Sequence, residues 1–285
     1  MPATVAQLAQ QDTMNDYGRK LFYVNHPQIT SKADFASNCP SGGEQTIVLG
    51  CYHGGQSGIY VLDVNDPRLD GVEQVTAAHE MLHAAYERLS SSDKAKVDKM
   101  LEDYYKNDLK DQRILDVIDS YKKSEPNDVV NEMHSVFGSE IANLPAPLEA
   151  YYKRYFTNRA QVAAFAERYQ SEFTSRQATI DQYDAQLAAL KSRIEAGESD
   201  IKDQQANIDS QRAALMSLNN SDPSSYNASV PAYNRLIDAY NYQVSSIQNL
   251  IAQYNQLVET RNAVALEANQ LSKSLSSDVA PISKN

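Results

Sequence analysis

The chain has 285 residues, of which 37 are acidic and 26 basic, so its formal net charge is −11. A chain this acidic is not expected to bind nucleic acid or an anionic membrane surface. It has no run of about 18 apolar residues, and its start, Met1-Pro2-Ala3, leads into a polar segment rather than a signal peptide. We therefore expect neither a membrane span nor a leader within these residues.

The N-terminal segment is predicted to be helical. Apolar spacing over residues 3–23 favours one or two helices, which Asn25-His26-Pro27 ends. Ser31 can then cap a short helix that reaches Phe35.

A β-hairpin is predicted next, as the only β structure in the chain. Residues 46–52 and 58–64 are rich in β-branched and aromatic side chains, and the turn sequence His53-Gly54-Gly55-Gln56-Ser57 lies between them. His53 could line a cleft, but we interpret it as a solvated turn residue.

The two cysteines, Cys39 and Cys51, flank a short loop-rich piece. A disulfide between them is sterically plausible and would indicate an exported protein. The alternative is a pair of reduced thiols in a cytosolic chain. A zinc knuckle is not expected, because there is no C-x-x-C sequence.

Residues 75–86 contain the motif H-E-x-x-H among helix-favouring Ala, Met and Leu residues. Because residues four apart share a helix face, His79 and His83 can direct two imidazoles at one metal ion. Glu80 beside them can accept a proton from a metal-bound water. The alternative is a pair of surface or core histidines. A zinc site also needs a third protein ligand, which must come from further along the chain.

The following segment is predicted to be helical throughout. Helices are expected over residues 90–105 and 110–121, and another begins near residues 124–128 and carries Glu132. Pro147 suits the first turn of the next one.

The two histidines with Glu80, and the later pair Asn131-Glu132, resemble the metal-binding motifs of the gluzincin metallopeptidases, over about residues 45–140. The resemblance implies a zincin-like fold, peptide-bond hydrolysis and a Zn²⁺ ion held by His79, His83 and Glu132. It also implies that Glu80 is the general base. Val136 departs from the family pattern, which has a carboxylate at that position.

Three groups compete for the third ligand position. Glu132 is favoured, while His134 faces elsewhere on the same helix and is expected to bind the transition-state oxyanion. Glu140 could instead orient a ligand histidine. Ordinary polar contacts are the other interpretation for His134 and Glu140. Tyr86 is interpreted as a core residue rather than an oxyanion donor.

In zincins the strand before the metal helix pairs with an extended substrate. By this resemblance, the strand of residues 59–64 is a candidate substrate cradle through β-augmentation.

The last 120 residues or so carry heptad repeats, which favour a coiled coil over an ordinary helical bundle. The first series has Ile180, Tyr183, Leu187, Leu190, Ile194, Ile201, Ile208, Leu215 and Leu218, interrupted by Gly197, Gln204 and Gln211. The second has Leu236, Tyr240, Ile247, Leu250, Tyr254, Leu257, Val264, Ala268, Leu271 and Leu275, interrupted by Gln243 and Arg261. Residues 219–231 are predicted to be the loop between two antiparallel arms, the second about 45 residues long and ending near residues 170–180.

The predicted architecture is α+β and mostly α. It comprises a zincin-like catalytic domain (1–158), an antiparallel coiled-coil hairpin (159–276) and a flexible tail (277–285). The predicted function is zinc-dependent peptide hydrolysis in an exported or extracellular protein, with a cytoplasmic location as the alternative. The substrate would be a peptide or protein, and the coiled coil could bind a protein partner. The alternative function is a coiled-coil assembly or adhesion module that carries a structural or degenerate zinc domain.

Overall fold

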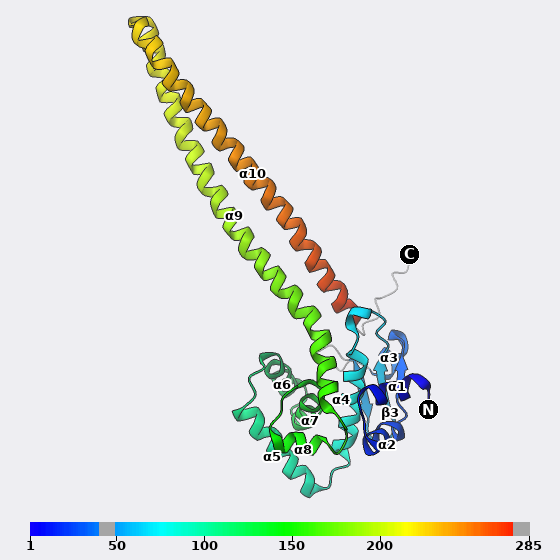
Figure 1. Cartoon of the computed structure of the whole chain (residues 1–285). Coiled ribbons are helices and arrows are strands. Elements are labelled where there is room, and N and C mark those ends of the chain that lie inside the picture. The colour runs from blue at the N-terminus through cyan, green and yellow to red at the C-terminus, as the bar shows by residue number, and fades with distance from the viewer. Residues whose placement is uncertain (40–48, 276–285) are drawn as a thin grey trace. The chain divides into compact units, whose positions relative to one another are not determined.

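The computed structural model describes residues 1–39 and 49–275, and it is mostly helical, with a small three-stranded sheet and a long helical hairpin (Figure 1). The strands are β1 (Gln28–Thr30), β2 (Gly50–His53) and β3 (Gly58–Leu62). The helices are α1 (Ala3–Gln11), α2 (Asp16–Val24), α3 (Lys32–Asn38), the 3-10 turn η1 (Pro67–Leu69), α4 (Val72–Glu87), α5 (Ser91–Asn107), α6 (Gln112–Ser124), α7 (Val129–Glu140), α8 (Ala146–Tyr152), α9 (Arg159–Ser221) and α10 (Pro223–Leu275). No helix in these ranges is long and apolar enough to cross a membrane.

The chain divides into two compact units. One contains Met1–Thr174 together with the chain from Asn269 onward, and the other contains Ser175–Ala268. Helix α9 begins at Arg159, where the hairpin segment was predicted to start, and runs from the first unit into the second. The predicted tail, residues 277–285, lies outside the described residues.

The sheet has the order β1-β3-β2. Strands β2 and β3 form the predicted antiparallel hairpin, although residues 46–48 of its first run lie outside the described residues. The expectation of no further β structure is wrong, because β1 pairs in parallel with β3. This strand has only three residues, the first of them exposed. Such a short edge strand leaves no alternating pattern in the sequence.

Strand β3 is the central strand, with a partner on each side. A central strand has no free backbone edge with which to pair a substrate. The expectation that residues 59–64 form the substrate cradle is therefore wrong. Strand β2, which pairs only with β3 among the described strands, forms an edge of the sheet.

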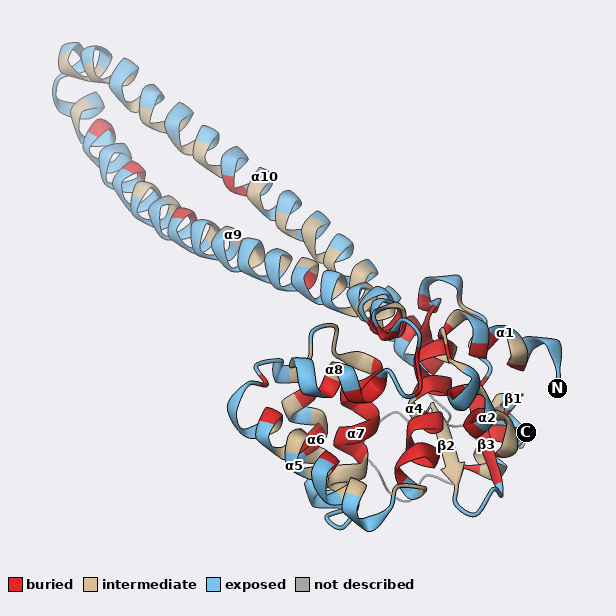
Figure 2. Ribbon diagram, turned by 60° about the horizontal axis from the view of Figure 1, so that its bottom comes forward, coloured by how far each residue is buried: buried red, intermediate tan, exposed pale blue. Residues whose placement is uncertain are grey.

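The main core of the first unit lies around α4 and α7, which are coloured almost entirely as buried in Figure 2. The start of α9 also holds the end of α7. The Arg159 guanidinium donates to the carbonyl oxygens of Ile141 at 2.5 Å and Ala142 at 2.9 Å, and it forms an ion pair with Glu149. Those carbonyls follow the last turn of α7, so a buried cation satisfies acceptors that the helix leaves unpaired.

Helices α9 and α10 pair along the predicted heptad positions, which are buried or half-buried except for exposed Gln211. Two ion pairs join the arms, Arg176 with Glu267 and Arg261 with Asp184. A Cβ added at Gly197 would lie 2.0 Å from Ile247 Cδ1, so the helices approach closely there. These contacts define one antiparallel register.

The C-terminal end of α10 lies where the heptad pattern predicts. Within the first unit, Leu271 and Leu275 form a hydrophobic cluster with Leu69 and Val72, and Tyr169 and Phe173 pack against it. The second arm thus ends near residues 170–180, as predicted, but it is 53 residues long rather than about 45.

The predicted loop at residues 219–231 is wrong. Helix α9 ends at Ser221 and α10 begins at Pro223, so Asp222 alone separates them. The Asp222 carboxylate accepts hydrogen bonds from the Ser224 and Ser225 amides, which caps α10. Proline at the first helical position suits this start, and Pro231 is accommodated inside the helix.

Candidate metal centre

Helix α4 carries the H-E-x-x-H motif and begins at a glycine that the backbone requires. Gly71 has φ 108°, in the left-handed region, and a Cβ there would lie 2.7 Å from the Phe165 carbonyl oxygen. From this start the helix turns Glu80 and His83 inward, leaving 5% and 8% of these residues exposed. Glu80 and His83 therefore face the protein interior, and His79 is half-buried.

Helix α7 packs against α4, and a glycine lets the two come close. A Cβ added at Gly138 would lie 2.5 Å from Leu82 Cδ1 and 2.6 Å from Tyr152 Cε1. This close packing brings the buried carboxylate of Glu132, at the start of α7, against the histidines of α4.

His79, His83 and Glu132 form one compact group of donor atoms. The two histidine Nε2 atoms are 3.0 Å apart, Glu132 Oε1 lies 3.4 Å from His83 Nε2, and Oε2 lies 3.6 Å from His79 Nε2. Nitrogen and oxygen ligands around one tetrahedral Zn²⁺ are separated by about 3.3 Å, given bonds of about 2.0–2.1 Å. The chain's own residues thus have the spacing and the donor types that zinc requires.

Glu132 is placed as an ionised carboxylate. Burial opposes its ionisation, but the neighbouring His83 and His79 charges, with hydrogen bonds from His79 and Tyr121, hold the pKa of this carboxyl below its usual value. Its Oε2 is buried, and its contact with His79 Nε2, at 3.6 Å, is longer than a normal hydrogen bond. A buried oxygen of this kind is costly unless something else binds it, and a cation between the three side chains would do so.

Glu80 lies beside the ligand group, under the edge strand. Burial, which outweighs the charge of His83, raises the pKa of its carboxyl to about 7. A Cβ added at Gly50 of β2 would lie 2.6 Å from Glu80 Oε1 and 2.8 Å from its Cγ. Only glycine lets the backbone of β2 come this close to the carboxyl group.

The structure does not bring His134 to this group. The residue is fully buried, its Nε2 lies 2.8 Å from the Tyr151 hydroxyl, and the Tyr152 hydroxyl donates to its carbonyl oxygen. Burial, with the charges of His83 and His79, lowers the pKa of His134 to about 3, so the ring is neutral. The oxyanion role expected for His134 stays a prediction without geometric support.

Glu140 and Tyr86 also have their hydrogen-bond partners outside the candidate ligand group. Glu140 Oε2 accepts hydrogen bonds from Arg113 at 2.7 Å and from Gln170 at 3.1 Å, so its carboxylate is held by these two residues and not by His79 or His83. The buried Tyr86 donates its hydroxyl to Asp98 at 2.7 Å. The interpretation of Tyr86 as a core residue is confirmed.

Cys39 and Cys51 form the predicted disulfide, with their Cα atoms 5.9 Å apart. His53, at the end of β2, lies beside it and is half-buried, with Nε2 2.9 Å from the carbonyl oxygen of Asn38. The interpretation of His53 as a solvated turn residue is therefore wrong.

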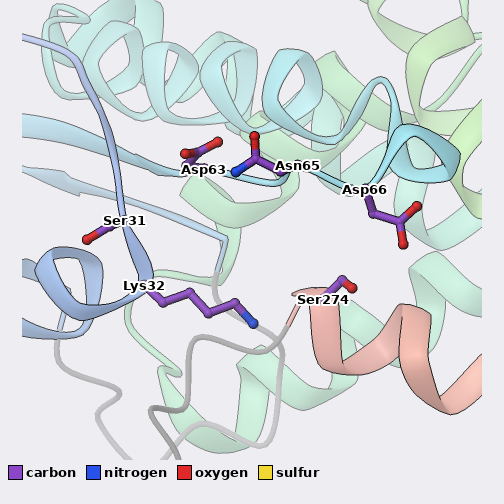
Figure 3. A pocket seen from close by; sticks show the side chains of 6 residues that line it. All are labelled: Ser31, Lys32, Asp63, Asn65, Asp66 and Ser274. Carbon is purple, nitrogen blue, oxygen red and sulfur yellow. The ribbon is translucent and has the colours of Figure 1, made fainter.

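A separate polar cavity of about 320 Å³ lies away from the ligand group, and Figure 3 shows its lining. Lys32 extends across it and donates to the carbonyl oxygen of Lys273 at 2.7 Å. The other lining residues are Ser31, Asp63, Asn65, Asp66 and Ser274. None of His79, His83 and Glu132 lines this cavity, so it is separate from the candidate metal centre.

Three further residues contribute to the candidate centre and were not among the predicted site residues. Tyr121 of α6 hydrogen-bonds Glu132, Gly50 admits Glu80 beneath β2, and Gly138 sets the α4–α7 distance. The two glycines could have been suspected, because each interrupts a strand or helix pattern. Tyr121 left no signal, because only the packing of α6 on α7 brings it to the site.

Comparison of the chain with protein-family models, with curated proteins and with solved structures finds no match.

Proposed function

We propose that residues 1–158 are a zinc-dependent metallopeptidase domain of the gluzincin type. The observation that carries the proposal is the mutual spacing of His79, His83 and Glu132, with all three donor atoms within 4.8 Å of one another. Two imidazoles and one carboxylate leave a fourth tetrahedral position open, which is the pattern of catalytic rather than structural zinc sites.

When bound, zinc supplies a Lewis acid that activates water and polarises the scissile carbonyl. Glu80 accepts the proton of the attacking water on a carboxylate oxygen and delivers it to the leaving amine. Its burial beneath β2 keeps bulk water away from that oxygen and fixes its position. Tyr121 holds Glu132 ionised and oriented through its hydrogen bond.

The edge strand β2 is proposed to position the peptide. It replaces β3 in that role, because β2 is at the edge of the sheet and its Gly50 lies against Glu80. An extended peptide paired with this edge would have its backbone next to the general base. Such pairing would contact mainly the backbone of the substrate, which suits a peptidase because all peptides share that backbone.

Two further features support proposals about the location of the protein and about its binding partner. The disulfide is typical of proteins that mature in an oxidising compartment, so an exported location is proposed. The α9–α10 hairpin exposes long polar helical faces and is proposed to bind a protein partner or the natural substrate.

The test compares zinc content and peptide hydrolysis in the wild type and in Glu80→Gln. The variant should keep about one zinc per chain, and it should lose at least about 100-fold in kcat/KM because proton transfer is lost. Glu132→Gln should lose zinc itself. Glu102→Gln changes an exposed carboxylate on α5 and should match the wild type in both measurements.

Full activity in Glu80→Gln would contradict the mechanism, and full zinc content in Glu132→Gln would contradict the ligand set. Bound zinc without turnover of any peptide in a diverse library would favour the alternative, a coiled-coil assembly module with a structural zinc domain.

A further inference from the structure

A second group of metal-type donors lies outside the proposed active site. Cys39 ends α3, while Cys51 and His53 both lie on β2. One donor atom from each of these three residues falls within 4.8 Å of the others. Cys39 is buried, and Cys51 and His53 are half-buried, so the group is packed but not sealed from solvent.

The distances within this group suit a soft divalent ion. Cys51 Sγ lies 3.6 Å from His53 Nε2, and sulfur and nitrogen ligands of one tetrahedral Zn²⁺ are about 3.5 Å apart. The Asn38 carbonyl oxygen lies 2.9 Å from His53 Nε2 and 3.9 Å from Cys51 Sγ. This carbonyl oxygen therefore borders the space between the three side chains.

The imidazole of His53 is held in place by its surroundings. Its ring meets the ring of Tyr60 edge-on, with the centroids 5.6 Å apart. A ligand that packing has already oriented loses little freedom when it binds a metal. This placement is more than a disulfide needs, because a disulfide requires only its two cysteines.

We propose that Cys39, Cys51 and His53 form a second divalent-metal site that exists only when the disulfide is reduced. The disulfide and the metal are then alternative clamps between α3 and β2. Because β2 carries Gly50 against Glu80, either clamp would keep the edge strand in place under oxidising or reducing conditions. The proposal goes beyond the peptidase function and does not depend on it.

The chemistry balances as two steps. A dithiol reductant supplies two electrons and two protons, leaves as its own disulfide, and converts the bridge into two thiols. The sulfur atoms then separate, and the incoming ion displaces both thiol protons to solvent as the thiolates bind. The His53 tautomer changes so that Nε2 offers its lone pair to the ion in place of its contact with Asn38.

Cobalt titration of the full chain tests the proposal. Protein reduced with a phosphine, then desalted without air, is titrated with Co²⁺ and compared with the untreated disulfide form. The reduced wild type should gain thiolate-to-cobalt charge-transfer absorption that rises to a plateau as Co²⁺ is added, and the disulfide form should not. The proposed active site has no thiolate, so it cannot produce this signal, and the Glu132→Gln variant should show it undiminished.

Two variants locate the third ligand. His53→Ala should weaken cobalt binding at the thiolate site by at least about tenfold. His26→Asn is the matched control, because His26 is exposed and has the positive φ of 49° that asparagine tolerates. Its titration should equal that of the wild type. No charge-transfer absorption in the reduced wild type, or an unchanged affinity in His53→Ala, would overturn the proposal.

Discussion

Helices pair in two different ways in this protein. The α4–α7 pair buries carboxylates and imidazoles among fully buried apolar side chains. The α9–α10 pair, by contrast, leaves most of its seam half-exposed. In the first pair a shift of an ångström would separate the donor atoms of the proposed zinc site, whereas in the second the contacts are spread along a long seam. The difference shows that the helix pair where chemistry is proposed is buried far more completely than the coiled-coil seam.

Polar residues also differ between the coiled-coil seam and the core of the first unit. Arg261 in the seam forms a bidentate pair with Asp184 at 2.9 Å and 3.1 Å, and water reaches both side chains. Asp12 at the end of α1 is fully buried, and neither of its carboxylate oxygens has a hydrogen-bond partner. A polar group in the seam stays hydrated and costs little folding free energy, whereas a buried polar group without a hydrogen-bond partner destabilises the core.

Phe137→Ala should have the largest effect on stability. Phe137 is fully buried on α7, and its ring meets that of Tyr104 edge-on at 5.2 Å. Removing it should lower the free energy of unfolding by about 3–5 kcal/mol through lost burial and a cavity. Denaturant titration followed by circular dichroism measures the change. The matched seam variant, Tyr254→Ala, should cost well under half as much, because Tyr254 is half-exposed. Equal losses would break the comparison.

Asp12→Asn should stabilise the protein. Burial raises the pKa of Asp12 well above 3.8, so the folded protein keeps a proton that the unfolded chain has already released. Wild-type stability is therefore lost as the pH rises through this interval. The variant should gain about 1–3 kcal/mol near pH 8, because no carboxylate charge is then buried.

This advantage should shrink as the pH falls and disappear below the ordinary pKa of 3.8, where folded and unfolded wild type are both protonated. Denaturant titrations at a series of pH values check the slope. A benefit that does not change with pH would show that ionisation is not its cause.

The two close-approach glycines give the sharpest comparison. Gly138→Ala should destabilise by about 1–3 kcal/mol and weaken zinc binding, because the new methyl group meets Leu82 and the rigid ring of Tyr152. Gly197→Ala meets a single side chain, Ile247, at Cδ1 (2.0 Å) and Cγ1 (3.0 Å). Its cost should be offset by a gain of about 1 kcal/mol in helix propensity.

Adding Ile247→Val to Gly197→Ala should recover most of that gain in stability, since valine lacks the Cδ1 atom that lies 2.0 Å from the new methyl group. Unfolding free energies and zinc affinities of the variants decide the matter. A larger loss at Gly197 than at Gly138 would contradict the contrast between the two helix pairs.

The sequence predicts periodic and local features well. The H-E-x-x-H helix, the disulfide and the seam positions each follow from residue spacing, and the structure contains them. The tip of the hairpin was missed because Asn, Ser and Pro residues favour a loop, whereas capping by Asp222 outweighs that preference. Strand β1 was missed because its pairing depends on a strand about 30 residues away in the chain.

The candidate site was predictable only in part. H-E-x-x-H places two donors on one helix face, and Glu132 follows from the resemblance rather than from any local rule. His134 lies two residues later, about 200° around the helix, where it contacts Tyr151 instead. Which face of α7 meets α4 is decided by tertiary packing at Gly138, and one chain's periodicity does not reveal that choice.

Arg159 gives the fold a thermodynamic link between two of its helices. It is the first residue of α9, and its hydrogen bonds hold the carbonyl groups that follow α7, the helix of Glu132. A partner that displaces the first turn of α9 must therefore break bonds at the C-terminal end of the helix whose first turn carries the proposed zinc ligand Glu132. By reciprocity, zinc would then alter the affinity for that partner by the same factor as the partner alters the affinity for zinc. The binding of zinc and the binding of the partner would then be thermodynamically coupled.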